Sequence, residues 1–113
     1  MLVDLGEMIH VIERRRFEGD VRRHFFGVVE GVSDQAVRLS GYLFVFVPGS
    51  SSFSKSKERR TRIIPLVSSG VILNVAPADT VLEEVKYVET NGRLSVTDGG
   101  VFSLDINEFS SFR

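Results

Sequence analysis

The sequence predicts a mainly β protein. Three observations carry this prediction: runs of β-branched and aromatic residues, turn residues at regular spacing between the runs, and glycines inside the two longest runs. The chain has 113 residues, of which 42% are hydrophobic, and this fits one folded unit with its own core. Because no apolar stretch reaches roughly 18 residues, we expect no membrane span and no membrane partner.

The first half of the chain is expected to form long, bent strands. A short N-terminal segment, whose spacing fits either a helix or a strand, precedes them. We expect strands over 9–17, 21–32 and 36–47, with turns at 18–20 and 33–35. Gly27 and Gly41 lie inside two of these strands, where glycine marks a bend or a close backbone approach. Two long strands with central glycines favour the strong coiling that a small barrel requires.

The second half is expected to consist of a loop and shorter strands. We expect an exposed basic loop over 48–61, strands over 62–66 and 71–75, and a capped turn starting at Asp79. Pro65 lacks an amide donor, so its strand belongs at an edge or a bulge. Asn91-Gly92 is a strong hairpin signal, and Asp98-Gly99-Gly100 predicts a second hairpin. We expect residues 78–113, with their two hairpins, to form a C-terminal β-meander that packs on the domain formed by 1–77.

The net charge of −1 conceals a segregation of charge along the chain. Residues 14–62 contain eleven Lys and Arg against five Asp and Glu, a net charge of +6. A basic surface of this kind fits an acidic partner such as RNA. Three other roles for these basic residues stay open: a contact between subunits, pairing with nearby carboxylates, and a charged hairpin tip that keeps the protein soluble. Phe53 is an aromatic ring beside the basic loop on which a base would stack.

The sequence gives little support for catalysis or metal binding. Cysteine is absent and histidine occurs only as His10 and His24, which removes thiol nucleophiles and most metal sites. His24 lacks a predicted partner for general-base chemistry, and no nucleophile-elbow or phosphate-loop motif is present. We therefore expect no enzyme activity, cofactor or metal. Asp4 and Glu7 stand where a secretory signal would be basic and then apolar, so a cytoplasmic location is expected.

Several of these features together resemble an Sm-like domain. Gly27-Val28-Val29, Asp34 and the apolar run over 37–46 match its first motif, and the segment IIPLVSSGVILNVAP matches its second. The resemblance covers roughly residues 9–77. It implies a strongly bent five-stranded barrel with a short N-terminal segment, to which this chain adds a C-terminal β-meander. It also implies a homo-oligomeric ring closed by edge-strand pairing, with RNA as a partner of the ring.

The sequence departs from the Sm-like pattern at the residues that hold RNA in that family. The 33–38 turn has no Asn after Asp34, and the second motif has Val67-Ser68-Ser69-Gly70 in place of Arg-Gly. The binding candidates for RNA or another acidic partner are therefore Asp34 and nine basic residues: Arg14, Arg16, Arg22, Arg23, Lys55, Lys57, Arg59, Arg60 and Arg62. No DNA-specific motif is present. Two other interpretations stay open: an assembly module without nucleic-acid binding, and a barrel whose phenylalanines line a small-molecule pocket.

Overall fold

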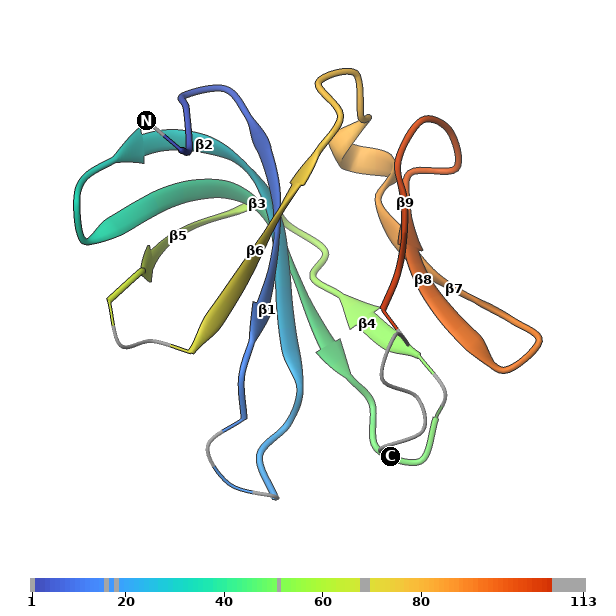
Figure 1. The fold of residues 1–113 in the computed structure, drawn as a ribbon. Helices are drawn as coiled ribbons and strands as arrows, with labels where there is room; N and C mark the ends of the chain where they lie inside the picture. Colours follow the sequence, from blue (N-terminus) through green and yellow to red (C-terminus); the bar gives the residue numbers. More distant parts are fainter. Residues whose placement is uncertain (1, 16, 18, 51, 68–69, 107–113) are drawn as a thin grey trace.

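The computed structural model describes residues 2–15, 17, 19–50, 52–67 and 70–106, which form two antiparallel β-sheets (Figure 1). These residues contain nine strands and one short 3₁₀ helix, η1. The elements are β1 (Met8–Glu13), β2 (Arg23–Val32), β3 (Ala36–Phe46), β4 (Phe53–Lys55), β5 (Arg60–Pro65), β6 (Val71–Ala76), η1 (Leu82–Glu84), β7 (Lys86–Thr90), β8 (Arg93–Thr97) and β9 (Ser103–Asp105). The prediction of a mainly β fold is confirmed.

The first sheet has the strand order β4-β3-β2-β1-β6, and β5 also pairs with β3. The length of β3 explains this arrangement, because its two halves serve two partners: Ala36–Gly41 pairs with β5, and Phe44–Phe46 pairs with β4. Within the described residues β5 and β6 share no ladder, so the sheet stays open along these two strands. Pro65 ends the edge strand β5, as its missing amide donor predicts.

The sheet bends where two glycines face each other. Gly27 of β2 pairs directly with Gly41 of β3, and the two backbones approach closely there. A Cβ on Gly27 would lie 2.8 Å from the carbonyl oxygen of Ser40, and a Cβ on Gly41 would overlap the carbonyl oxygen of Phe26. The expected role of the mid-strand glycines is therefore confirmed. The approach is possible only because neither residue has a side chain.

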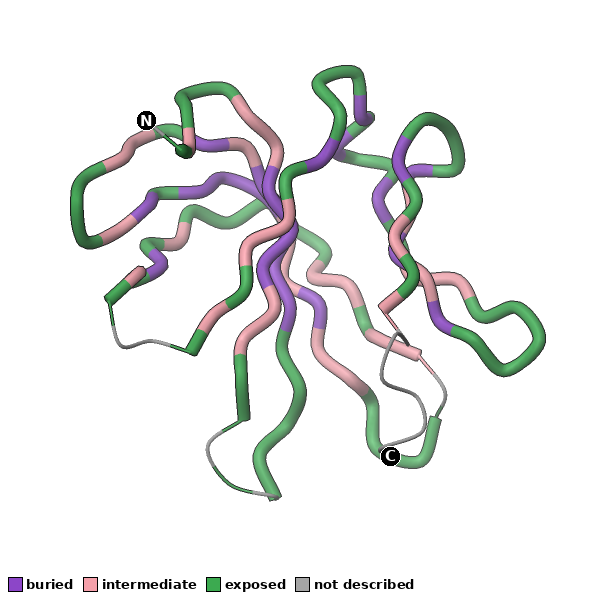
Figure 2. Tube along the Cα trace, in the orientation of Figure 1, coloured by how far each residue is buried: buried purple, intermediate pink, exposed green. Residues whose placement is uncertain are grey.

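Two hydrophobic clusters lie on opposite faces of the first sheet, and Figure 2 shows the burial along its central strands. The inner cluster belongs to the first sheet alone and contains Ile9, Val11, Phe25, Val29, Val37, Leu39 and Ile64. The inter-sheet cluster combines residues of both sheets with residues of η1 and the connecting segments: Phe26, Phe44, Ala76, Leu82, Val85, Val96 and Phe102. Alternation along the strands produces this division, because Phe25 and Phe26 point to opposite faces. The second sheet thus covers one face of the first.

The second sheet has the order β7-β8-β9 and is joined by the two expected hairpins. Asn91 and Gly92 both have positive φ, 54° and 76°, as the turn between β7 and β8 requires. The expected cap at Asp79 is wrong, since η1 has no side-chain cap at its start. Asp98 instead binds the segment before η1, by accepting the Val81 amide hydrogen at 3.0 Å. No helix in the described residues is long and apolar enough to cross a membrane.

Three expected boundaries also need correction. β1 ends at Glu13 and β2 begins at Arg23, so the first hairpin has shorter strands than the 9–17 and 21–32 segments predicted. Of the two conformations that fitted the N-terminal segment, the helix does not form in residues 2–7. The segment 48–61, expected as a loop throughout, contains β4. Pairing with the end of β3 overrides its serine-rich composition.

Candidate functional site

Three of the predicted basic residues lie at the end of the β1–β2 hairpin. Arg14 and Arg22 flank the paired strands, and Arg23 begins β2 opposite Glu13 of β1. All three are exposed, and the side chain of Arg14 passes beside Gly70, just before β6. Arg16, also predicted as a binding residue, lies outside the described residues. The hairpin thus brings several positive charges to one end of the first sheet.

Arg62 joins this end of the sheet from β5. Its guanidinium lies 3.8 Å from a carboxylate oxygen of Glu13 and 5.8 Å from the centre of the Phe25 ring. Arg60, at the start of β5, is exposed. The alternation of β5 places Arg60 and Arg62 on the face that carries buried Ile64. Glu13 therefore has Arg23 beside it on β2 and Arg62 across the bent sheet.

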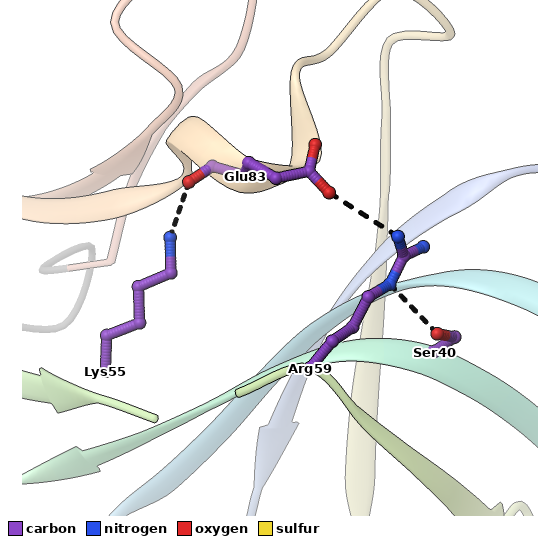
Figure 3. A network of polar contacts seen from close by, with 4 residues as sticks. All are labelled: Ser40, Lys55, Arg59 and Glu83. Carbon is purple, nitrogen blue, oxygen red and sulfur yellow. Dashed lines mark hydrogen bonds and ion pairs between the residues drawn. The ribbon is translucent and has the colours of Figure 1, made fainter. Parts of the chain in front are cut away.

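Lys55 and Arg59 point in a different direction and hold the chain around η1 (Figure 3). Lys55 Nζ donates to the carbonyl oxygens of Glu83, at 2.8 Å, and Val85, at 2.7 Å. Arg59 Nε donates to Ser40 Oγ at 3.0 Å, and its Nη1 lies 3.4 Å from the Glu83 carboxylate. These two side chains thus connect the first sheet to the segment that leads into the second sheet.

The environment of Lys55 is partly apolar. Its ammonium lies 4.4 Å from the centre of the Tyr42 ring and 5.8 Å from that of Phe44. Desolvation lowers the pKa of Lys55, while the carboxylates of Glu84 and Glu83 act in the opposite direction. The ammonium is therefore held by carbonyl oxygens and aromatic rings. The five bases predicted between 55 and 62 therefore do not form one surface. Two further predicted binding residues are exposed: Lys57, which follows β4, and Asp34 in the β2–β3 turn.

A buried polar cluster that the sequence did not predict lies between the two sheets. Tyr87 Oη lies 2.8 Å from His10 Nε2 and 2.6 Å from His24 Nδ1. Asn74 Nδ2 lies 3.4 Å from His10 Nδ1. Neighbouring strands supply these groups: His10 pairs with Phe26 on β2 and with Asn74 on β6, and His24 is two residues before Phe26. We call His10, His24, Tyr87 and Asn74 the histidine–tyrosine cluster.

Burial keeps both histidines of this cluster neutral. His10 is fully buried, and desolvation followed by the charge of His24 lowers its pKa to about 3. His24 is 6% exposed, and desolvation followed by the charge of Arg22 lowers its pKa to about 4. Desolvation also raises the pKa of Tyr87. No charge therefore resides in the cluster at neutral pH.

One hydrogen-bond pattern fits these neutral groups. A neutral imidazole has one donor and one acceptor nitrogen, and a tyrosine hydroxyl has one proton to donate. With Asn74 donating to His10 Nδ1, the Nε2–H of His10 donates to Tyr87, and the Tyr87 hydroxyl donates to His24 Nδ1. The tautomers are assigned from this pattern. The cluster acts as a polar connection between the sheets, and the described residues hold no group of three or more metal-ligating side chains.

The structure changes the role expected for Phe53. One side of its ring stacks on Tyr87, with centres 4.3 Å apart and an interplanar angle of 26°. His24 lies 4.6 Å away at 34°. Tyr87 is stacked on Phe53 and the tilted His24 ring lies close to it, so Phe53 serves packing between the sheets. The phenylalanines considered for a ligand pocket are also mostly core, since Phe25, Phe26 and Phe44 are at most 1% exposed.

The fold and these contacts define the class of protein: a mainly β chain whose two antiparallel sheets are held together by an aromatic and histidine-containing interface. Comparison of the chain with protein-family models, curated proteins and solved structures finds no match. The strand edges and the surface charges of this chain are the features that bear on its function.

Proposed function

We propose that this chain is a non-enzymatic, Sm-like module that assembles into a homo-oligomeric ring and binds RNA through its arginine-bearing hairpin end. The observation that carries the proposal is the open first sheet. Strand β6 ends the strand order and β5 branches from β3, and each of the two has one partner among the described residues. We also propose that the protein is cytoplasmic.

The two open edges favour head-to-tail assembly. An edge strand offers unpaired backbone groups to another chain, and proteins normally protect such an edge. Here both edges carry exposed aliphatic residues: Ile63 on β5 is 60% exposed, and Ile72 and Val75 on β6 are each 57% exposed. Pairing of β5 in one protomer with β6 in the next would cover both edges. Because this contact uses two different surfaces, its repetition produces a closed ring when the rotation permits closure.

The arginines support RNA as the partner. Arg14, Arg22 and Arg23 are exposed at the hairpin end of the first sheet, within the segment of net charge +6. In a ring, this end would repeat once per protomer and give a continuous basic surface. Phosphate contacts from such a surface supply affinity that falls steeply with salt concentration.

Assembly is tested by the mass in solution, measured by size-exclusion chromatography with light scattering. We expect a single assembly whose mass is several times the mass of one chain. Ile72→Lys places a charge on the β6 edge and should reduce the mass to that of one chain. Val81→Lys is the matched control, since Val81 is 50% exposed but precedes η1 and should leave the mass unchanged. A monomeric wild-type protein would overturn the ring.

RNA binding is tested by fluorescence anisotropy with a labelled oligouridylate at two salt concentrations. We expect the logarithm of the binding constant to fall linearly with the logarithm of the salt concentration, with a slope of about −0.7 for each phosphate contacted. Arg23→Gln should weaken binding and flatten the slope, whereas Lys86→Gln, an equal change of charge on β7, should change neither. No binding by an assembled wild-type protein at low salt would exclude RNA.

A second candidate function, assembly without nucleic-acid binding, is favoured by one observation. Three of the predicted binding cations already serve internal contacts: Lys55 and Arg59 hold the chain around η1, and Arg62 pairs with Glu13. An intact ring that does not bind the oligonucleotide supports this candidate.

A further inference from the structure

A row of side chains crosses three neighbouring strands at the border of the second sheet. Arg22 precedes β2, Phe46 ends β3 and Phe53 begins β4. The Phe46 amide donates to the carbonyl oxygen of Arg22 at 3.0 Å, and Phe46 pairs with Phe53 in the β3–β4 ladder. The arginine and the two rings are therefore fixed next to one another by backbone hydrogen bonding.

The two phenylalanines of this row differ in what covers them. Phe53 has Tyr87 stacked on it and His24 close by, as described above. Phe46 meets Phe53 edge to face, with ring centres 5.4 Å apart and an interplanar angle of 74°. Phe46 is only partly buried, while Phe44, two residues before it on the same face, is 1% exposed. Phe46 is thus the end of the aromatic row that faces solvent.

Arg22 lies over Phe46 at a distance that allows displacement. The guanidinium carbon is 6.0 Å from the ring centre, at the outer limit of a cation–π contact. No carboxylate of the described residues lies within ion-pair distance of this guanidinium. Arg22 is exposed, and its charge already affects its surroundings, because it contributes to the lowered pKa of His24. The row therefore ends in a weakly held cation above an aromatic ring.

We propose that Arg22 and Phe46 form a base-stacking site that selects single-stranded RNA. A base stacks on the ring of Phe46 and displaces the guanidinium, which then contacts an adjacent phosphate. This inference rests on the RNA binding proposed above and names the form of RNA that is bound.

Physical chemistry favours a single strand at this site. Bases in a duplex already stack on one another, whereas an unpaired base has two free faces for an aromatic side chain. Arginine suits the second role, since its planar guanidinium both stacks on rings and pairs with phosphate. Exposed Arg23, the next residue, extends the positive charge along the strand that carries the site.

The test compares a labelled single-stranded RNA with the same RNA annealed to its complement. We expect the wild-type protein to prefer the single strand. Phe46→Leu keeps an aliphatic side chain in place and should lower the affinity for the single strand about five-fold or more, with the affinity for the duplex unchanged. Val101→Ala is the control, because Val101 is 55% exposed in the turn between β8 and β9, outside the arginine-bearing hairpin, and should change neither affinity.

Arg22→Lys provides a second variant that keeps the charge and does not depend on the fold tolerating a change at Phe46. It should reduce the preference for the single strand and leave the salt dependence unchanged. If the wild-type protein binds both RNAs equally, or if Phe46→Leu and Arg22→Lys bind the single strand as wild type does, the stacking site is overturned while RNA binding stands. An equal loss in Val101→Ala also overturns it. If the wild-type protein binds neither RNA, the proposed function itself fails.

Discussion

The Tyr87 hydroxyl oxygen lies 2.6 Å from Nδ1 of His24, although 63 residues separate them in the chain. This contact crosses the boundary between the two sheets, because His24 belongs to β2 and Tyr87 to β7. The same hydroxyl contacts His10 of β1 at 2.8 Å. One oxygen atom therefore connects three strands, and burial lowers the pKa of both histidines that it contacts.

The first prediction is a loss of stability in mild acid. The folded-state pKa values are about 3 for His10 and about 4 for His24, both below the ordinary 6.5. Because both are lowered, the unfolded chain binds protons more readily below pH 6.5. The stability contributed by the neutral histidines is thus fully present above that pH. It is lost as the pH falls toward the folded-state pKa values of about 4 and about 3. At pH 5 we expect a loss on the order of 2 kcal/mol for each histidine.

Urea unfolding followed by circular dichroism between pH 7.5 and 5 checks this expectation. His24→Gln removes one of the two titrating groups, so its loss of stability between these pH values should be about half that of the wild-type protein. A wild-type unfolding midpoint that does not change between pH 7.5 and 5 would contradict the neutral histidine–tyrosine cluster.

The second prediction concerns the Tyr87 hydroxyl itself. Tyr87→Phe keeps the ring that stacks on Phe53 but leaves both histidines without their shared partner. Buried polar groups that lose a partner are costly, so we expect a destabilisation of about 1–3 kcal/mol in urea unfolding at pH 7.5. Tyr42→Phe is the control: its ring keeps the Lys55 contact, and a change within about 0.5 kcal/mol is expected. Equal stability of the two variants would show that the hydroxyl does not connect the sheets.

The parts of the fold that sequence reasoning predicted are those encoded locally. Gly27 and Gly41 mark the bend because glycine alone fits a close backbone approach, and Asn91-Gly92 forms its hairpin because both residues adopt positive φ. Such signals lie within a few residues of the structure they produce. They identify strands and turns without information about distant contacts.

The candidate site and β4 depend on distant contacts and were missed for that reason. In the histidine–tyrosine cluster, Tyr87 lies 63 positions after His24 and 77 positions after His10 in the chain. Nothing near either histidine in the sequence indicates Tyr87. The serine-rich segment around β4 has a loop composition, yet Phe53 stacks on Tyr87 of the second sheet, and Lys55 binds carbonyl oxygens of Glu83 and Val85 in the segment that leads into that sheet. A basic residue in such a segment predicts exposure, whereas Lys55 is partly covered by aromatic rings.

The third prediction tests the bend of the first sheet. An added methyl group at Gly41 would overlap the Phe26 carbonyl and approach Gly27, both of which belong to the paired backbone. The strands would have to separate, so Gly41→Ala should destabilise the fold by about 3 kcal/mol or more. Gly31→Ala, on the same ladder, is the control, since its Cβ would lie 3.7 Å from Arg38 in ordinary contact. Thermal unfolding of both variants checks this, and comparable melting temperatures would contradict the close approach.

The fourth prediction concerns the connection made by Lys55. Lys55→Met keeps a long apolar chain over Tyr42 and removes the ammonium that binds the Glu83 and Val85 carbonyl oxygens. The segment around η1 then loses two charge-assisted hydrogen bonds, and we expect faster amide hydrogen exchange over residues 78–90. The exchange of β2 and β3 should stay unchanged, because their ladder does not use the ammonium.

Hydrogen exchange measured by mass spectrometry separates a local effect from a global one. Lys57→Met removes an equal charge from an exposed lysine two residues further along the chain, and it should exchange as the wild-type protein does. If the Lys55→Met and Lys57→Met variants both match the wild type over 78–90, the ammonium does not hold the second sheet. In that case the apolar inter-sheet cluster and the histidine–tyrosine cluster together suffice to keep the sheets in contact.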